Sequence, residues 1–159
     1  MKIQKNHVAY TFAFTFVSAV AFIYAFIAIS LVPYWQELSG TEIQDWWSGP
    51  FTRFSNIMVP IHFLSIISMV AAFVFNIKGK NKALWGVALA TLLVCQGFNF
   101  GLYGGVYNPA LQSGALEGQE ALRTFDRWDF YHTVRTISVC ISLISLMVIG
   151  IRQNAVGKG

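Results

Sequence analysis

The chain has 159 residues, of which 55% are hydrophobic and 11% are charged, and its formal net charge at pH 7 is +4. Soluble domains carry roughly 25% charged residues, so this composition excludes an ordinary water-soluble domain. The length predicts one domain, residues 1–159. The positive charge does not indicate a nucleic-acid partner, because the basic residues lie in short segments between apolar runs, as in membrane proteins.

Four apolar stretches cover residues 8–32, 54–77, 83–107 and 128–151, approximately. Each has the roughly 20 residues that a helix needs to cross about 30 Å of hydrocarbon. The sequence therefore predicts an all-α fold, an integral membrane bundle of four transmembrane helices. The first stretch is longer than the apolar region of a signal peptide, so we expect it to be retained as a helix.

Three connections join these stretches. The second, Lys78–Lys82, is a tight basic turn, whereas residues 33–53 and 108–127 are expected to form periplasmic loops. The tryptophans of the first loop fit an interfacial belt, a lid packed over the bundle, or a surface on which a ligand stacks. Residues 43–51 are amphipathic, and we expect them to lie flat on the outer surface.

The charges are segregated along the chain. Lysines occur at the N-terminus, in the second connection and at the C-terminus, whereas all 7 acidic residues fall on the opposite side. The positive-inside rule places both termini in the cytoplasm. The expected location is the inner (cytoplasmic) membrane of a bacterium.

Polar side chains inside the spans are expected to mark function, because burying them in hydrocarbon is costly. At 1.5 Å per residue, His62 and Asn99 lie about 12 Å below the outer edge, His132 about 6 Å and Arg135 about 10 Å. Tyr24 of the first span lies at a similar level. All four helices are therefore expected to place polar groups in one layer in the outer half of the membrane.

Helical spacing supports this convergence on the fourth span. Trp128, His132 and Arg135 are three or four residues apart and share one face of the helix. Asp129 precedes His132 by three residues, so its carboxylate could orient the imidazole.

Each residue also has a structural interpretation. Arg135 can snorkel to the outer surface or pair with Asp126 or Asp129. A histidine at the depth of His132 is commonly solvated or caps a helix, and His62 can be a satisfied structural histidine.

On the third span, Gln96 and Asn99 fit interhelical hydrogen bonds. Tyr103 fits packing, and Gly97 and Gly101 fit close helix contact. Cys95 and Cys140 are expected to be small buried hydrophobes rather than a disulfide.

His62 and His132 could together ligate copper, iron or haem, but no HxxxH, ExxH or HxH pair is present. A metal usually requires three or more protein ligands. No cofactor and no metal site is therefore predicted.

Two segments resemble a known family. They are Asn108-Pro109-Ala110-Leu111 and the run from Arg127 to Thr136, Arg-Trp-Asp-Phe-Tyr-His-Thr-Val-Arg-Thr. Together they are similar to the anthrone-oxygenase-like family of small four-helix membrane proteins. Asn108, Trp128, His132 and Arg135 match the family's pattern, whereas Tyr131 stands where many members have an asparagine. The resemblance implies an enzyme that oxidises anthrones to anthraquinones without metal or flavin.

We therefore expect either an oxygenase or a protein without catalytic activity. In the oxygenase, an apolar aromatic substrate would lose a proton to a histidine, and cationic and amide groups would stabilise the anion. The expected catalytic residues are His132, Arg135 and His62, and the expected substrate-binding residues are Asn99, Asn108, Trp128 and Tyr103. The alternative is an accessory subunit of a larger membrane complex, or a quinone- or lipid-binding protein. The expected partners are the bilayer, a small apolar or aromatic ligand, and another membrane complex or a second copy of the chain.

Overall fold

The structure, a computed structural model, describes residues 5–156. These residues are helical throughout, apart from short connections, and form no strand. Four helices are long and apolar enough to cross a membrane: His7–Gln36, Gly40–Asn76, Lys82–Gln112 and Gly118–Gln153. This confirms the prediction of an all-α protein with four apolar helices.

Three of the four long helices contain a π-helical segment, in which each turn is wider than in an α-helix. In chain order the elements are α1 (Lys5–Phe26), π-helical Ile27–Leu31, α2 (Val32–Gln36), α3 (Gly40–Trp46), π-helical Trp47–Phe51, α4 (Thr52–Asn76), α5 (Lys82–Gly97), π-helical Phe98–Tyr107, α6 (Asn108–Gln112) and α7 (Gly118–Val156).

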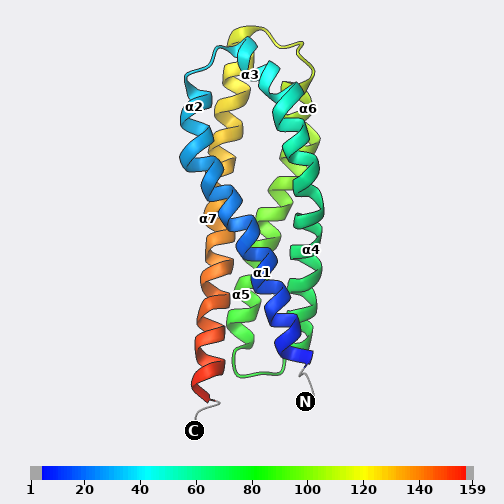
Figure 1. Cartoon of the computed structure of the whole chain (residues 1–159), viewed down its shortest axis with the longest axis vertical. Helices are drawn as coiled ribbons and strands as arrows, with labels where there is room; N and C mark the ends of the chain where they lie inside the picture. The colour runs from blue at the N-terminus through cyan, green and yellow to red at the C-terminus, as the bar shows by residue number, and fades with distance from the viewer. Residues whose placement is uncertain (1–4, 157–159) are drawn as a thin grey trace.

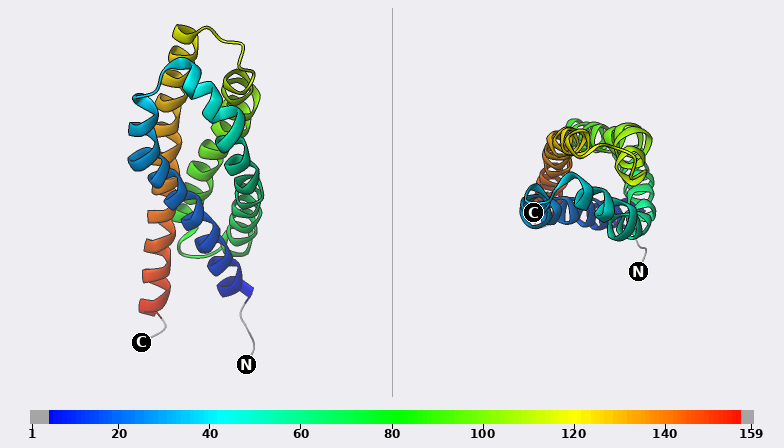
Figure 2. Two further views of the ribbon diagram at one scale, coloured as in Figure 1. Left: turned by 45° about the horizontal axis from the view of Figure 1, so that its top comes forward. Right: turned by 90° about the horizontal axis from the view of Figure 1, so that it is seen from above.

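The four long helices stand at the corners of a square, in the order of the chain (Figure 2). α1 packs against α4 and α7, and α5 packs against α4 and α7. The start of α1, the turn between α4 and α5, and the end of α7 lie at one end of the bundle, whereas α3 and α6 lie at the other (Figure 1). Both described chain ends are therefore on the same side.

The two segments expected as periplasmic loops are mostly helical. Only residues 37–39 and 113–117 lie outside helices at the α3/α6 end of the bundle. The proline positions explain this difference. Pro33 and Pro109 each lie in the first turn of a helix that follows a π-helical segment, and Pro50 lies inside one. Because proline lacks an N–H and its ring clashes with a carbonyl in a regular α-helix, a wider turn accommodates it and the helix continues.

Residues 43–51 do not form a separate surface helix, contrary to the expectation. Ser39 caps α3 reciprocally: its hydroxyl accepts from Glu42 N, and its own N–H donates to Glu42 Oε2 at 2.8 Å. α3 then packs on α7, where a side chain on Gly40 would collide with the backbone of Gly118. Gln44 adds two hydrogen bonds, both 3.0 Å, to the backbone N–H and carbonyl of Leu116.

The half of the bundle nearer the described chain ends has an apolar core. Met69, Trp85 and Leu92 are fully buried there. Its buried polar groups are serines, and Ser142 donates to the Ala88 carbonyl at 2.8 Å. Both cysteines are free, and Cys95 is buried as expected, whereas Cys140 is half-buried. Buried histidine and arginine side chains occur only in the other half, within the described part of the chain.

Candidate functional site

An aromatic cluster closes the α3/α6 end of the bundle. It consists of Trp35, Trp47, Phe51, Phe125 and Trp128, none more than 5% exposed. The ring centroids of Trp35 and Trp47 are 4.9 Å apart, and those of Trp47 and Trp128 are 5.3 Å apart. A belt at the membrane surface would expose its indoles, so the belt interpretation is wrong for these tryptophans and the packed-lid interpretation holds.

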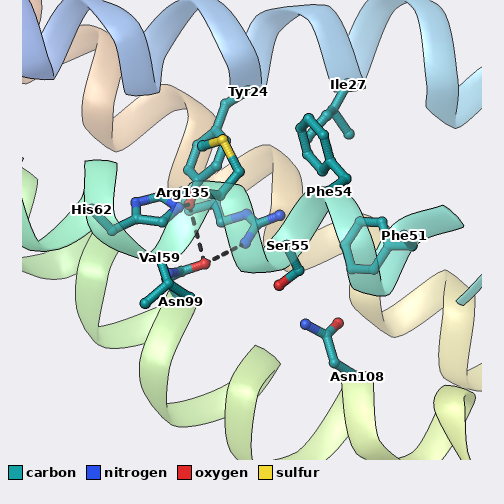
Figure 3. Close-up of a pocket in the computed structure, with 11 residues that line it drawn as sticks. Tyr24, Ile27, Phe51, Phe54, Ser55, Val59, His62, Asn99, Asn108 and Arg135 are labelled. Atoms are coloured by element: carbon teal, nitrogen blue, oxygen red, sulfur yellow. Dashed lines mark hydrogen bonds between the residues drawn. The ribbon is translucent and has the colours of Figure 1, made fainter. Parts of the chain in front are cut away.

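Asn108 joins this aromatic cluster to the interior. Its Oδ1 accepts hydrogen bonds from Trp47 Nε1 at 3.3 Å and from Trp128 Nε1 at 3.2 Å. An indole nitrogen can only donate, so the two bonds fix which end of the amide is oxygen. The Nδ2 group has no protein partner among the described residues and lies on the side of a small cavity (Figure 3).

Arg135 lies inside the bundle and is 3% exposed. Its Nε and Nη2 lie 3.0 and 2.9 Å from His132 Nδ1, and its Nη1 donates to Asn99 Oδ1 at 3.0 Å. The guanidinium carbon is 3.7 Å from the ring centroid of Tyr103 and 4.3 Å from that of Tyr24. Arg135 therefore neither snorkels to the surface nor pairs with Asp126 or Asp129.

His132 accepts hydrogen bonds from the guanidinium and does not line the cavity. Its Nδ1 accepts from Arg135, so its Nε2 carries the proton of the neutral ring and donates to the Tyr24 carbonyl at 3.2 Å. Both ring nitrogens are thus occupied. Asp129 does not orient this imidazole, since it accepts a hydrogen bond from Gln36 at 3.2 Å instead.

The Tyr24 hydroxyl links two other helices. It lies 3.2 Å from Asn99 Oδ1 on the third long helix and 3.2 Å from His62 Nε2 on α4. The bond from Arg135 identifies the Asn99 oxygen, leaving Asn99 Nδ2 without a protein partner in the described chain. His62 Nδ1 is buried and also has none.

These groups surround one small cavity (Figure 3). Its volume is about 40 Å³, room for about three water molecules. Exposed Val59 lies on its wall, so the cavity approaches the outside of the bundle along α4. The lining residues are Tyr24, Ile27, Phe51, Phe54, Ser55, Met58, Val59, His62, Asn99, Asn108 and Arg135.

Hydrogen-bond donors dominate the polar lining. A guanidinium has five N–H donors, and Arg135 uses three of them on His132 and Asn99. Its two remaining donors, with the Nδ2 groups of Asn99 and Asn108, are available to a ligand. Arg135 is the one cation of the lining, and no acidic side chain is part of it.

The structure brings the predicted polar layer together, but divides the predicted residues into two groups. His62, Asn99, Asn108 and Arg135 line the cavity. His132, Trp128 and Tyr103 lie behind these residues: Tyr103 donates to the Trp128 carbonyl at 2.7 Å and stacks on the guanidinium.

Several residues that line the cavity are not among the site residues expected from the sequence. The expected site residues do not include Tyr24, although its position among polar groups at one depth is a signal for it. Ser55, Phe54 and Met58 gave no signal, because such residues are ordinary near a helix end.

The donor set does not suit a metal ion. Within the described chain no group of three or more histidine, cysteine, aspartate or glutamate side chains gathers. Both nitrogens of His132 are hydrogen-bonded, and the neighbouring guanidinium would repel a cation.

The sequence matches no protein-family model, and no curated protein or solved structure matches the chain.

Proposed function

We propose that this chain is a membrane enzyme that holds an apolar aromatic substrate by one oxygen atom, removes a proton from it, and lets the resulting anion react with O₂ without a resident metal or flavin. The observation that carries the proposal is the donor-lined cavity around Arg135. Unpaired donors and one uncompensated cation suit a ligand atom that is rich in electrons and has no proton to donate, such as a phenolate or enolate oxygen.

The free-energy cost of burying the charge of Arg135 supports an anionic ligand. An isolated buried charge is unfavourable by several kcal/mol, even after relaxation. Stacking on Tyr24 and Tyr103 offsets part of that cost, but no carboxylate neutralises the group within the lining. An anionic ligand would supply the missing charge and bind more strongly for it.

His62 is the base in this proposal, and His132 is not, because His132 has no free nitrogen. His62 Nε2 faces the Tyr24 hydroxyl, which lines the cavity. The substrate proton therefore passes to the Tyr24 oxygen while the hydroxyl proton moves to His62 Nε2. Arg135, Asn99 and Asn108 stabilise the substrate anion.

The oxidation balances without a further reductant. The substrate carbanion, R₂CH⁻, adds O₂ to form a peroxide anion, which takes the proton back and loses water to leave a ketone. The sum is R₂CH₂ + O₂ → R₂C=O + H₂O. The resemblance of residues 108–111 and 127–136 to the anthrone-oxygenase-like family supports this reaction type.

Oxygen uptake by the purified protein with anthrone tests the proposal. We expect uptake above the uncatalysed rate, lost in His62→Gln and Arg135→Met and kept in Arg127→Met, whose arginine is exposed on the same helix. Uptake that is equal in all four proteins, or absent in the unchanged chain, would refute an oxygenase.

The small cavity favours a second candidate, a protein that binds the polar head of a quinone or lipid. A volume of about 40 Å³ admits a carbonyl or head-group oxygen, whereas drug-sized ligands occupy pockets of about 300–1000 Å³. The rest of such a ligand would remain among lipid chains beside Val59. Binding of ubiquinone that depends on Arg135, without oxygen uptake, would favour this candidate. Co-migration with a larger complex on native gels would favour an accessory subunit.

We also propose that the chain lies in a bacterial inner membrane with both ends in the cytoplasm and the aromatic cluster toward the periplasm. The exposed lysines of the turn between α4 and α5 support it. A membrane-impermeant thiol reagent applied to intact cells should label Ser113→Cys and leave Lys80→Cys unlabelled. The reverse pattern would overturn the orientation.

A further inference from the structure

Two buried polar atoms near the proposed base have no protein partner in the described chain. They are His62 Nδ1 on α4 and Gln96 Oε1 on α5. His62 is 3% exposed and Gln96 is 2% exposed, so neither is satisfied by bulk solvent. An unmade hydrogen bond at a buried polar atom costs about 1–3 kcal/mol, and two in one place call for a common explanation.

The two atoms lie at neighbouring levels. Gln96 Nε2 donates to Ser65 Oγ at 3.2 Å, and Ser65 Oγ donates to the His62 carbonyl at 2.7 Å. Because the serine proton is used in the second bond, Ser65 must accept in the first, and this fixes Oε1 as the free end of the Gln96 amide. Gln96 and Ser65 thus sit one turn deeper than Asn99 and His62, respectively.

The imidazole points its second nitrogen toward that deeper level. In Figure 3 one nitrogen of His62 faces the Tyr24 hydroxyl, and the other points away from Arg135 and from the Asn108 side of the cavity. The nitrogen that faces Tyr24 is Nε2, at 3.2 Å, so the other is Nδ1.

We propose that Gln96 is a positioning residue for His62: its Oε1 accepts the Nδ1–H of the imidazolium, directly or through one water molecule. When His62 carries both protons, Nε2–H donates to the Tyr24 oxygen, the Tyr24 hydroxyl donates to Asn99, and Nδ1–H donates to Gln96. His62 Nδ1 and Gln96 Oε1, the two buried atoms without a partner at this level, then satisfy each other. While the Tyr24 hydroxyl donates to Asn99, only the imidazolium, the state that the base reaches after it has taken a proton, has a proton for both the Tyr24 oxygen and Gln96. In the neutral ring the bond to Gln96 forms when the Tyr24 hydroxyl donates to Nε2 instead.

The charge of Arg135 controls when His62 becomes protonated. The titratable or charged groups facing His62 and its hydrogen-bonded partners are Tyr24 from α1, Cys95 from α5 and Arg135 from α7. A positive imidazolium beside an unneutralised guanidinium is unfavourable. An anion at Arg135 removes that repulsion, so His62 gains a proton when the cavity binds an anion.

The role of this proton in turnover rests on the function proposed above, whereas the hydrogen bond to Gln96 does not. Nitrogen NMR of protein labelled with ¹⁵N-histidine separates the two. The chain has 3 histidines, and His62→Gln assigns the His62 signals. The probe is 2-naphthoate, an apolar aromatic carboxylate.

In the unchanged chain at pH 7, we expect 2-naphthoate to convert the His62 signals from the neutral to the imidazolium form. Gln96→Glu should show imidazolium without the probe, because a carboxylate then faces Nδ1. Gln96→Leu should stay neutral with the probe bound. Ser142→Ala, which alters another polar contact between α5 and α7, should behave as the unchanged chain does.

Identical His62 signals in Gln96→Glu, Gln96→Leu and the unchanged chain would overturn the role of Gln96. If Gln96→Leu does not fold, Gln96→Met supplies the same test. If 2-naphthoate fails to bind, the proposed anion site is wrong, and the comparison of Gln96→Glu with the unchanged chain, both free of probe, still decides the hydrogen bond.

Discussion

Replacing Arg135 with methionine should separate function from stability. Methionine keeps an unbranched side chain of similar length but removes the charge and all donors. Truncating one partner of a buried charged pair costs about 2–5 kcal/mol of binding. We therefore expect the affinity for an anionic aromatic ligand to fall about 30- to 4000-fold, at 1.4 kcal/mol for each tenfold change.

The effect on folding should be much smaller. The variant loses three hydrogen bonds from a charged group to two acceptor atoms, worth about 1.5–3 kcal/mol for each acceptor, and the stacking on Tyr24 and Tyr103. It also avoids the desolvation of a buried charge, several kcal/mol of opposite sign. These contributions nearly cancel, so the free energy of unfolding should change by no more than about 2 kcal/mol.

The assay is quenching of tryptophan fluorescence by 2-naphthoate, because Trp47 and Trp128 both donate to Asn108, which lines the cavity. Urea unfolding in the same detergent gives stability, and Arg127→Met is the matched control. Unchanged affinity in Arg135→Met would refute the anion site. A loss of stability above about 4 kcal/mol, near the cost of breaking a buried ion pair, would show that the arginine serves the fold instead.

Three further substitutions test separate parts of the site. Asn108→Asp keeps an oxygen for both indoles but replaces the Nδ2 donor with negative charge, so anion affinity should fall at least about 10-fold; equal affinity by fluorescence titration would place the ligand elsewhere. Tyr24→Phe removes the proton relay and the link to Asn99, so oxygen uptake should fall about 10²- to 10⁴-fold; full activity would exclude Tyr24 from proton transfer. Gly40→Val forces a side chain against the Gly118 backbone, so the melting temperature in detergent should drop; an unchanged melting temperature would mean that α3 does not pack on α7 as described.

Much of the bundle is readable from the sequence because hydropathy alone determines where helices cross an apolar layer. The meeting of His62, Asn99 and Arg135 inside the bundle was also predictable, because polar side chains at one level of apolar helices avoid the apolar surroundings by facing the interior. The cost of leaving a polar side chain in apolar surroundings is enough to predict that these residues meet, even when the hydrogen-bond partner of each one is unknown.

The ends of the helices were less predictable. Pro33 and Pro109 indicate loops when a regular α-helix is assumed, and the π-helical segments that accommodate them have no clear sequence signal. As a result, the aromatic lid is a continuation of the long helices rather than a pair of loops.

The different roles of His132 and His62 could not be predicted from the sequence. Spacing places His132 and Arg135 on one face, but only coordinates show that their bond uses the second imidazole nitrogen and leaves His62 as the base candidate. Likewise, the residues next to Asn108 in the sequence do not indicate that two indole N–H groups donate to its Oδ1 and set the orientation of its amide.

The most direct measurement is an experimental structure of the chain with 2-naphthoate bound. The account predicts a ligand oxygen about 3 Å from the Arg135 guanidinium and within reach of Asn99 or Asn108 Nδ2, with the rings leaving the cavity past Val59. Ligand density on the lipid-facing surface, with the guanidinium contacting only His132, Asn99 and the tyrosine rings, would contradict it.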